Sequence, residues 1–282
     1  MFDIDRHAAE LECDGFTIMD RVLPPAAVDA ARIAIEETLA AEEELGRKYG
    51  LQSEHLRMAF NAQAKHRHFH GLPIQHPAPV EVARRVLGDD MFAHDVSIRV
   101  PMPTGKKDHQ RFGGNLHADW SDFTVAPFVG GRHYPMGVQS AWAITEFTKS
   151  TGGPLIWPRS HLTTEIPPEE PDTLPSGAVI AEAPAGSVLL WDASLWHTGG
   201  INHSDQPRYS LVFFFQRWWV KGFNDAYRYM PPDMREQMSP DERKLWGLEA
   251  GMPPNTHLRG MSTEQLAALS PEEQAVLNIA PY

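Results

Sequence analysis

The sequence contains a single cysteine, Cys13, among its 282 residues. One thiol cannot form a disulfide within the chain, and it cannot build a cysteine-based zinc or iron–sulfur site. We therefore interpret Cys13 as an ordinary thiol. A bound transition metal would have to be held by imidazole and carboxylate groups, for which the chain has 14 histidines and 37 acidic residues.

Basic residues are scarce as well, with 25 lysines and arginines against the 37 acids, and the formal net charge is −12. A charge of this sign repels nucleic acids and anionic membranes. No apolar run approaches the roughly 18 residues of a membrane span, and segment 1–16 carries acids where a targeting peptide would carry bases. These absences predict a soluble, cytoplasmic protein that binds neither nucleic acid nor membrane.

The first third of the chain predicts a helical flank over about 24–90. Residues 15–23 have the composition of a short strand, and Pro24-Pro25 then opens a run with apolar residues every three or four positions. That spacing predicts an amphipathic helix reaching Gly50. A second helix is predicted over 80–88, where the helical period ends at a glycine.

Residues 93–220 form short runs rich in Val, Ile, Phe and Trp, separated by Gly, Pro, Asn and Asp. This pattern predicts an antiparallel sandwich or barrel. In the tail, about 222–282, three segments have the pattern of a helix-opening capping box: Ser239–Glu242, Ser262–Gln265 and Ser270–Glu273. We expect a polar helical tail and interpret residues 1–282 as a single domain.

The tripeptide His117-Ala118-Asp119 follows a strand-like stretch. Residues two apart in an extended chain point to the same face, so the imidazole and the carboxylate can converge, with Asn115 on the same side. A similar triplet, His203-Ser204-Asp205, is interpreted as a solvated turn. The first triplet supplies two metal ligands and leaves a third to be found.

The third ligand is suggested by segment 186–212. An apolar strand leads to His197, a turn of Gly and Asn follows, and a second strand begins with Arg208. We expect a hairpin that places Arg208 beside His197. Two histidines and one carboxylate make the facial triad that leaves open positions on non-haem Fe(II), and the planar fork of Arg208 suits a dicarboxylate cosubstrate.

With these motifs the sequence resembles the phytanoyl-CoA dioxygenase family of Fe(II)- and 2-oxoglutarate-dependent oxygenases. The resemblance runs roughly from Gly15 to Gln216 through DGFTIMDRVL, LHAD, QSAWAITEFTKSTGGPLIWPRSH and GSVLLWDASLWHTGG followed by PRYSL. It implies a mainly β fold with flanking helices, a double-stranded β-helix or jelly-roll, cupin-like barrel. Arg159 departs from the family, which usually has glycine in this turn, and this puts the usual backbone geometry in doubt or adds a charge near the entrance.

The resemblance also implies the site. His117, Asp119 and His197 become the iron ligands, and Arg208, at the family's spacing after the distal histidine, anchors the C5 carboxylate of 2-oxoglutarate. Three residues with weaker matches are implied to contact the cosubstrate or first ligand: Asn115, Trp142 and Ser210.

The implied activity is oxidation, above all hydroxylation, of an unactivated C–H bond of a small molecule, as in natural product biosynthesis. Fe(II), 2-oxoglutarate and O₂ take part, and 2-oxoglutarate is decarboxylated to succinate and CO₂. Asp119 favours hydroxylation over halogenation, because related halogenases have a small residue there. The basic residues expected near the mouth favour an anionic substrate: Lys65, Arg67, Arg132 and Arg159.

Two other functions stay open: a non-catalytic jelly-roll protein that binds a metal or ligand as a sensor, and a zinc or cofactor-free cupin hydrolase. His66, His68 and His70 could gather a metal if they alternate on a strand, but without a carboxylate they are interpreted as a loop or a wall on the substrate side. The aromatic run 213–219 is expected in the sheet core, and the 120–137 insertion is assigned equally to a substrate pocket or to packing.

Overall fold

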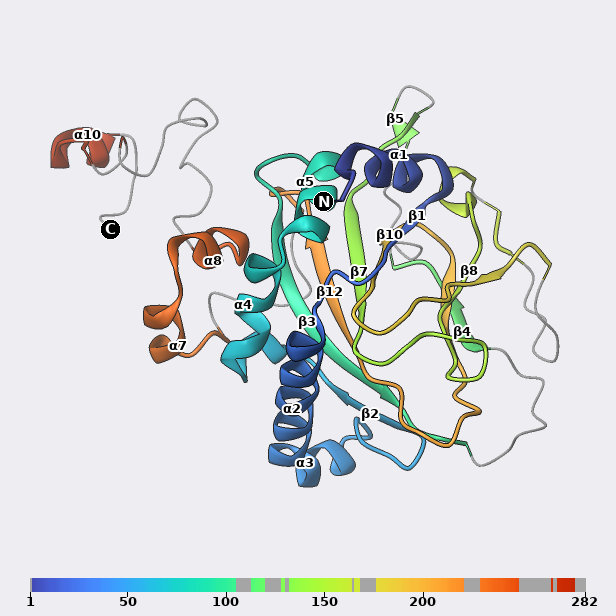
Figure 1. Ribbon diagram of the computed structural model, residues 1–282. Coiled ribbons are helices and arrows are strands. Elements are labelled where there is room, and N and C mark those ends of the chain that lie inside the picture. The colour runs from blue at the N-terminus through green and yellow to red at the C-terminus, as the bar shows by residue number, and fades with distance from the viewer. Residues whose placement is uncertain are drawn as a thin grey trace.

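The computed structural model describes residues 2–104, 113–119, 128–129, 132–163, 165–167, 176–220, 229–248, 265 and 268–276. Two antiparallel sheets face each other, and helices cover the outer face of the larger sheet (Figure 1). The larger sheet has the order β1-β10-β7-β12-β3-β2, and the smaller one has the order β4-β11-β8-β9. A short ribbon, β5-β6, stands apart from both sheets.

The strands of the larger sheet are β1 (Phe16–Met19), β2 (Leu56–Ala59), β3 (Phe92–Pro101), β7 (Gly137–Ala143), β10 (Val188–Asp192) and β12 (Ser210–Gln216). Those of the smaller sheet are β4 (Gly113–His117), β8 (Leu155–Ile156), β9 (Val179–Ile180) and β11 (His197–Gly200). The ribbon consists of β5 (Phe128–Val129) and β6 (Arg132–His133). Successive strands from β9 to β12 alternate between the two sheets, which is the connectivity of a jelly roll.

The fold prediction, mainly β with flanking helices in a jelly roll, is confirmed. Within the described residues the two sheets do not pair with each other, so the architecture is an open two-sheet sandwich rather than a closed barrel. The space between the sheets is therefore available for a site.

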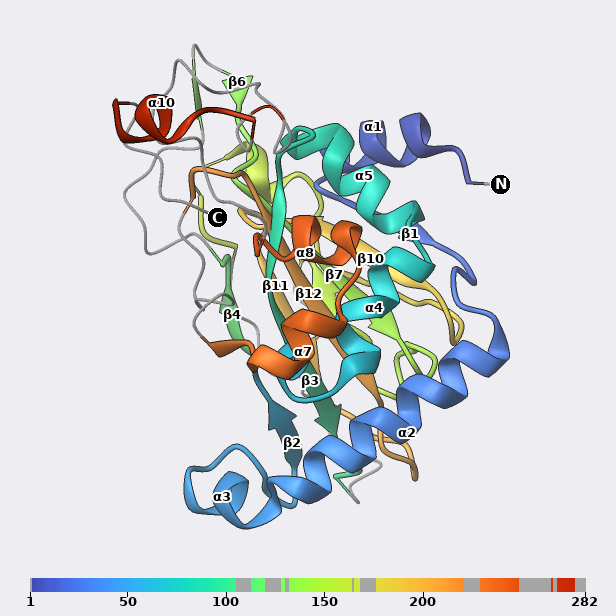
Figure 2. The same cartoon turned by 90° about the vertical axis from the view of Figure 1, so that its left-hand side faces the viewer.

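The helices are α1 (Ile4–Asp14), α2 (Pro25–Ala41), α3 (Glu43–Lys48), α4 (Arg67–Gln75), α5 (Ala78–Leu87), α7 (Pro232–Gln237), α8 (Pro240–Leu245) and α10 (Pro271–Val276), with 3₁₀ turns η1 (Ala62–Ala64) and η2 (Ser160–Leu162). In Figure 2, α4, α5 and α8 lie over the larger sheet. Among the residues described, no helix combines the length and the apolar character needed to cross a membrane.

Strand β12 shows how the sequence separates the two faces of the larger sheet. Leu211, Phe213 and Phe215 point into the core beneath the helices, whereas Val212 and Phe214 line a cavity between the sheets. This period of two is the strand geometry that alternating side chains require. The prediction that the aromatic run lies in the sheet core is thus confirmed for Phe213 and Phe215, but not for Phe214.

The helix expected from Pro24-Pro25 to Gly50 is two helices, so that prediction is corrected. Helix α2 ends at Ala41, and Glu42 adopts φ −110° and ψ 9° before α3 begins. The side chain of Gln52 lies under this break, where its Nε2 donates to the carbonyl of Leu39 at 2.9 Å. The flank also contains strand β2, which the helical interpretation of residues 24–90 missed.

Helix ends follow the sequence signals more closely. Gly88 ends α5 with φ 102°, as predicted. Ser239 and Glu242 form the expected capping box at α8, and Ser270 and Glu273 exchange the same pair of hydrogen bonds at α10. The third box, starting at Ser262, lies outside the described residues. Helix α1, capped by the side chain of Asp3, was not predicted.

The histidines at 66, 68 and 70 are not on a strand or loop. His66 is the N-cap of α4, and its Nδ1 accepts the backbone N–H of His68. His70 is buried and pairs through Nδ1 with Glu242 of α8 at 3.0 Å. Because the segment is helical, the three side chains point in different directions. His66 caps the helix, and His70 contacts the C-terminal helix α8.

Buried His94 makes the fold acid-sensitive. It is 2% exposed in β3, and burial lowers its pKa from 6.5 to about 3. Below pH 6.5 the unfolded chain binds a proton that the folded chain excludes, so stability present above that pH is lost as the pH falls toward about 3. At about pH 5 we expect this histidine to remove on the order of 2 kcal/mol of unfolding free energy.

Urea unfolding of wild type and His94→Leu at about pH 7.5 and pH 5 measures this effect. The variant is expected to lose clearly less stability between the two pH values, whereas His55→Gln, at an exposed position, should behave as wild type. Equal losses in wild type and His94→Leu would contradict the prediction.

Candidate active site

A cavity of about 610 Å³ lies between the two sheets. The larger sheet lines it with side chains of β2, β3, β7, β10 and β12, and the smaller sheet contributes the end of β4 and the whole of β11. Ala141, Phe147, Val212 and Phe214 give it apolar walls. Against these apolar walls, the cavity also holds charged and ionisable side chains, among them His117, Asp119, His197 and Arg208.

His117, Asp119 and His197 converge at this cavity. His117 ends β4 and is the cross-strand partner of His197 in β11, so sheet pairing brings the two rings to a centroid distance of 4.4 Å. Asp119 places Oδ1 3.8 Å from Nε2 of His117 and Oδ2 3.8 Å from Nε2 of His197. All three ligand atoms lie within 4.8 Å of one another, close enough to hold one metal ion.

Neighbouring groups orient the triad for metal binding. Nδ1 of His197 lies 2.9 Å from the carbonyl of Leu195, which holds the proton on Nδ1 and leaves the Nε2 lone pair toward the site. Burial lowers the pKa of His197, and the nearby carboxylate of Asp119 opposes this shift only in part. The lowered pKa favours the neutral ring that a metal ligand requires. Trp191 donates its indole N–H to Oδ2 of Asp119 at 3.4 Å and packs against His197 at 5.1 Å between ring centroids.

Arg208 lies in the same cavity, and no carboxylate of the described residues forms a salt bridge with it. It is 5% exposed, and its Nε and Nη1 have no hydrogen-bond partner among the described residues. Burial lowers its pKa from 12.5 to about 10, so it is still protonated at neutral pH. A buried unpaired cation is unfavourable, and the carboxylate of a ligand would supply the missing bidentate partner.

The hairpin expected to join His197 to Arg208 is not present. Strand β11 pairs with β4 and β8, whereas β12 pairs with β3 and β7. The chain crosses from one sheet to the other between these strands, and Arg208 precedes β12 with its N–H bonded to the carbonyl of Pro101 at 3.1 Å. The cation and the distal histidine thus reach the cavity from different sheets.

Residues 11–210 match the sequence profile of the family described as phytanoyl-CoA dioxygenase (PhyH). The chain belongs to the phytanoyl-CoA dioxygenase family. The resemblance on which the site prediction depended is thereby confirmed. The match ends at Ser210, just after Arg208, so it includes both histidines, the aspartate and the arginine of the cavity.

Individual relatives agree with this family. The dioxygenase af480 of Aspergillus fumigatus is 27% identical over 176 residues, which cover 61% of this chain and 52% of that protein. The dioxygenase andF of Emericella variicolor is 32% identical over 134 residues, covering 47% and 45%. The chain spans about half the length of these curated relatives.

A solved structure supports the fold. The epimerase SnoN, in complex with Fe³⁺, alpha ketoglutarate and nogalamycin RO, superposes with a TM-score of 0.57 at 18% identity. The superposition covers 76% of this chain and 83% of SnoN. At this identity the likeness shows the shared fold.

Of the three weaker site residues, Ser210 lines the cavity of this phytanoyl-CoA dioxygenase family member. Its hydroxyl donates to the carbonyl of Arg99 at 3.1 Å. Trp142 points to the opposite face of β7, fully buried beneath the helices, and donates to Ser140. Trp142 is therefore not among the described residues that line this cavity. Asn115 lies on β4, but its side chain is outside the described part of the chain.

Three cavity residues were missed by the sequence reasoning: Arg99, Gln139 and Trp191. Gln139 is 3% exposed, lines the cavity and has no partner for Nε2 among the described residues, so it offers a donor to a ligand. These three residues share one property: their side chains point from β3, β7 or β10 into the cavity. Which face of a strand borders the cavity can be assigned only after the order of the strands in the sheet is known.

Three of the basic residues expected at the mouth, Lys65, Arg67 and Arg159, are not among the described residues that line the cavity. Lys65 pairs with Glu42 at 2.7 Å, Arg67 is exposed on α4, and the side chain of Arg132 lies outside the described residues. Arg159 adopts a left-handed backbone conformation, which favours glycine, with φ 67°, and its Nη1 points to the carbonyl of Cys13 at 3.5 Å. The anionic-substrate prediction therefore gains no support from Lys65, Arg67 or Arg159 and stays a prediction.

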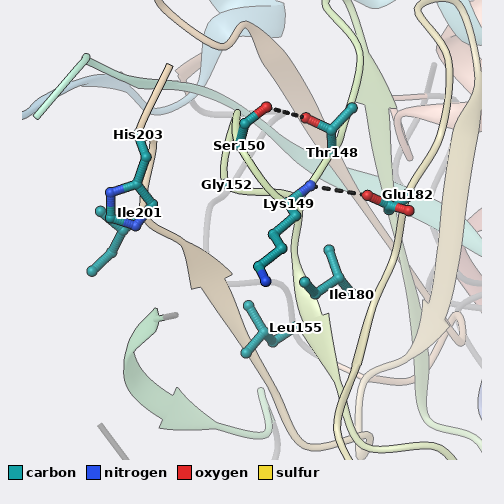
Figure 3. A pocket seen from close by; sticks show the side chains of 10 residues that line it. Thr148, Lys149, Ser150, Gly152, Leu155, Ile180, Glu182, Ile201 and His203 are labelled. Atoms are coloured by element: carbon teal, nitrogen blue, oxygen red, sulfur yellow. Dashed lines mark hydrogen bonds between the residues drawn. The ribbon is translucent and has the colours of Figure 1, made fainter. Parts of the chain in front are cut away.

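A second hollow of about 540 Å³ lies beside the 148–153 turn (Figure 3). The side chains of Lys149, Ile180 and His203 are among those that border it. His203 belongs to the His-Ser-Asp triplet that was interpreted as a solvated turn. The backbone N–H of Lys149 donates to Glu182 at 3.0 Å. Within the described residues, only the His117, Asp119 and His197 group could hold a metal, so this hollow is not a second metal centre.

Cys13 is free and exposed, as expected of an ordinary thiol. Much of the 120–137 insertion, residues 120–127 and 130–131, lies outside the described residues. Its described end is anchored where His133 Nε2 meets Oδ2 of Asp192 at 2.7 Å.

Proposed function

We propose that this protein is an Fe(II)- and 2-oxoglutarate-dependent oxygenase that oxidises, above all hydroxylates, a C–H bond of a small molecule. The observation that carries the proposal is one cavity holding both a two-histidine, one-carboxylate triad and a buried arginine with unpaired donors. The first fits a divalent iron with open coordination positions, and the second fits the distal carboxylate of the cosubstrate.

The roles of the residues follow from their positions. His117, Asp119 and His197 hold the iron, with Trp191 and the carbonyl of Leu195 fixing two of these ligands. Arg208 binds the C5 carboxylate of 2-oxoglutarate, and Ser210 lies close enough along the chain to assist. We keep Asn115 as a proposed contact beside His117. Asp119 supplies a protein carboxylate where halide would otherwise bind.

Bound iron supplies O₂ activation, which couples decarboxylation of 2-oxoglutarate to succinate and CO₂ with oxidation of the substrate. The chain's contribution is to hold the two organic molecules and to exclude water. The apolar walls formed by Ala141, Phe147, Val212 and Phe214 suit that task.

Natural product biosynthesis is the proposed setting, supported by the nogalamycin compound in the SnoN complex. A single domain over residues 1–282 is also proposed, supported by one core that joins Leu11, Phe213 and Trp246. A cytoplasmic location stays a prediction from composition.

Anaerobic addition of 2-oxoglutarate to the Fe(II)-loaded protein is expected to produce a metal-to-ligand charge-transfer absorption band. Admission of O₂ with a substrate panel should then release succinate well above a metal-free control. A band without succinate across the panel would favour the non-catalytic sensor. Neither band nor succinate, with zinc retained on anaerobic reconstitution, would favour the hydrolase.

A further inference from the structure

The cavity contains a second arginine, Arg99, that the triad and Arg208 do not explain. It lies on β3, where its cross-strand partners are Met58 on one side and Ser210 on the other. The period of two along β3 separates it from Ile98 and Val100, which are buried in the helix-covered core. Its side chain therefore lines the cavity from the larger sheet.

The contacts of Arg99 leave its charge unmatched. Nη1 meets the sulfur of Met58, a weak acceptor, and the guanidinium lies 4.7 Å from the ring centre of Phe60. Within the described residues no carboxylate comes within salt-bridge distance of it. Burial lowers its pKa, and the more distant Asp95 and Asp119 oppose that shift without contact.

Charge balance separates Arg99 from the cosubstrate site. Divalent iron, Asp119 and Arg208 together leave two positive charges, which the two carboxylates of 2-oxoglutarate neutralise. Among the described residues that line the cavity, Arg99 is then the remaining arginine or lysine. Asp95 offsets it only at a distance, because its Oδ1 accepts the backbone N–H of Asn61 at 2.9 Å.

The wall around Arg99 is mostly apolar. Leu56, Met58, Pro101 and Met102 line this part of the cavity. A ligand that fills it gains from burying hydrocarbon against these side chains and from one charge-assisted contact with the guanidinium. That combination describes an organic acid with an apolar body.

We propose that Arg99 binds the carboxylate of the substrate, so that the enzyme selects small organic acids with an apolar body. The proposal rests on the oxygenase function proposed above. A carboxylate at Arg99 could also come from 2-oxoglutarate through its C1 end, and the two sources are separated by experiment.

The test compares carboxylic acids with their uncharged amides. Zinc-loaded, 2-oxoglutarate-saturated protein is titrated by saturation-transfer NMR with benzoate, 4-phenylbutyrate and decanoate and with the three corresponding amides. Wild type is expected to bind at least one acid about ten-fold more tightly than its amide. Arg99→Gln should bring that ratio within about two-fold of unity, while Arg99→Lys retains part of it.

The matched control is Arg57→Gln. Arg57 lies on the neighbouring strand β2, but its Nη1 is bound to Glu36 at 3.0 Å and it does not line the cavity. This variant is expected to keep the wild-type acid preference. Thermal melts of all variants establish that each is folded before titration.

A second arm measures the affinity for 2-oxoglutarate through the charge-transfer band of the anaerobic Fe(II) protein. Arg99→Gln is expected to stay within about three-fold of wild type, because Arg208 holds the cosubstrate. Loss of 2-oxoglutarate binding in Arg99→Gln would assign Arg99 to the cosubstrate and overturn the proposal. So would a wild type without acid preference in any pair, or an Arg99→Gln variant that keeps the preference.

Failure of the oxygenase function itself would look different. Wild type would then give either no charge-transfer band with Fe(II) and 2-oxoglutarate or a band without succinate release, whatever the acid-to-amide ratio. Repeating the acid and amide titrations on metal-free protein that carries Arg208→Gln, so that position 208 no longer attracts the acid, tests the Arg99 subsite by itself, and the preference is expected to persist there.

Discussion

Arg208→Gln is expected to weaken 2-oxoglutarate binding on the order of 100-fold. The wild-type guanidinium is buried, and two of its donors have no partner among the described residues. A cosubstrate carboxylate would form a buried ion pair with it. Removing one partner of such a pair costs several kcal/mol of binding free energy. Glutamine keeps a donor but loses the charge and the bidentate fork. The affinity is measured by anaerobic titration of the Fe(II) protein, following the charge-transfer band.

A comparison with pyruvate, which lacks the distal carboxylate, sharpens this result. Wild type should prefer 2-oxoglutarate strongly over pyruvate, and Arg208→Gln should lose most of that preference. The surface variant Arg84→Gln, which only breaks a pair with Glu81, should behave as wild type. An unchanged preference in Arg208→Gln would remove Arg208 from the cosubstrate site.

Stability provides an independent readout for the same position. An uncompensated buried cation destabilises the fold, as the lowering of its pKa to about 10 indicates. Arg208→Met is therefore expected to raise the unfolding free energy of the metal-free protein on the order of 1 to 3 kcal/mol. A loss of binding together with a gain in stability cannot be attributed to misfolding.

His197→Ala is expected to lower iron affinity more than about 100-fold and to reduce succinate formation to the metal-free level. Removing the distal ligand leaves only His117 and Asp119, and changes in groups that merely orient ligands already cost 10- to about 100-fold. Iron content after anaerobic reconstitution and desalting measures the affinity, and succinate release measures turnover.

His203→Ala is the matched control, because His203 belongs to a similar His-x-Asp triplet but borders the second hollow instead of the triad. It should keep wild-type iron content and turnover. Full iron occupancy in His197→Ala, or equal loss in both variants, would show that the triad is not the iron site.

Features that depend on neighbours in the chain were predictable. Gly88 ends a helix because its positive φ suits glycine, and Ser239 with Glu242 caps α8 because the two lie three residues apart. The convergence of His117 and Asp119 is also local, although β4 ends at His117 and Asp119 reaches the site from the turn that follows the strand. Family membership rested on the same short motifs, which the profile match over residues 11–210 bears out.

Other features depended on which strands pair. His197 and Arg208 are close in sequence but belong to different sheets, and the short turn between them gave no sign of that crossing. Trp142 resembled a site residue by motif, yet the register of β7 turns it into the helix-covered core. His66 and His70 alternate as they would on a strand, but the chain there is helical because the segment docks against α8.

Local sequence patterns thus predicted the helix caps and a β sandwich or barrel, because these features use contacts within a few residues, and the family resemblance supplied the jelly roll and the proposed triad. Tertiary structure alone decided that Arg99 and Gln139 face the cavity and that Trp142 does not. The physical reason is that a strand has two faces of equal geometry. Only pairing with distant strands determines which one is buried under helices and which one meets a ligand.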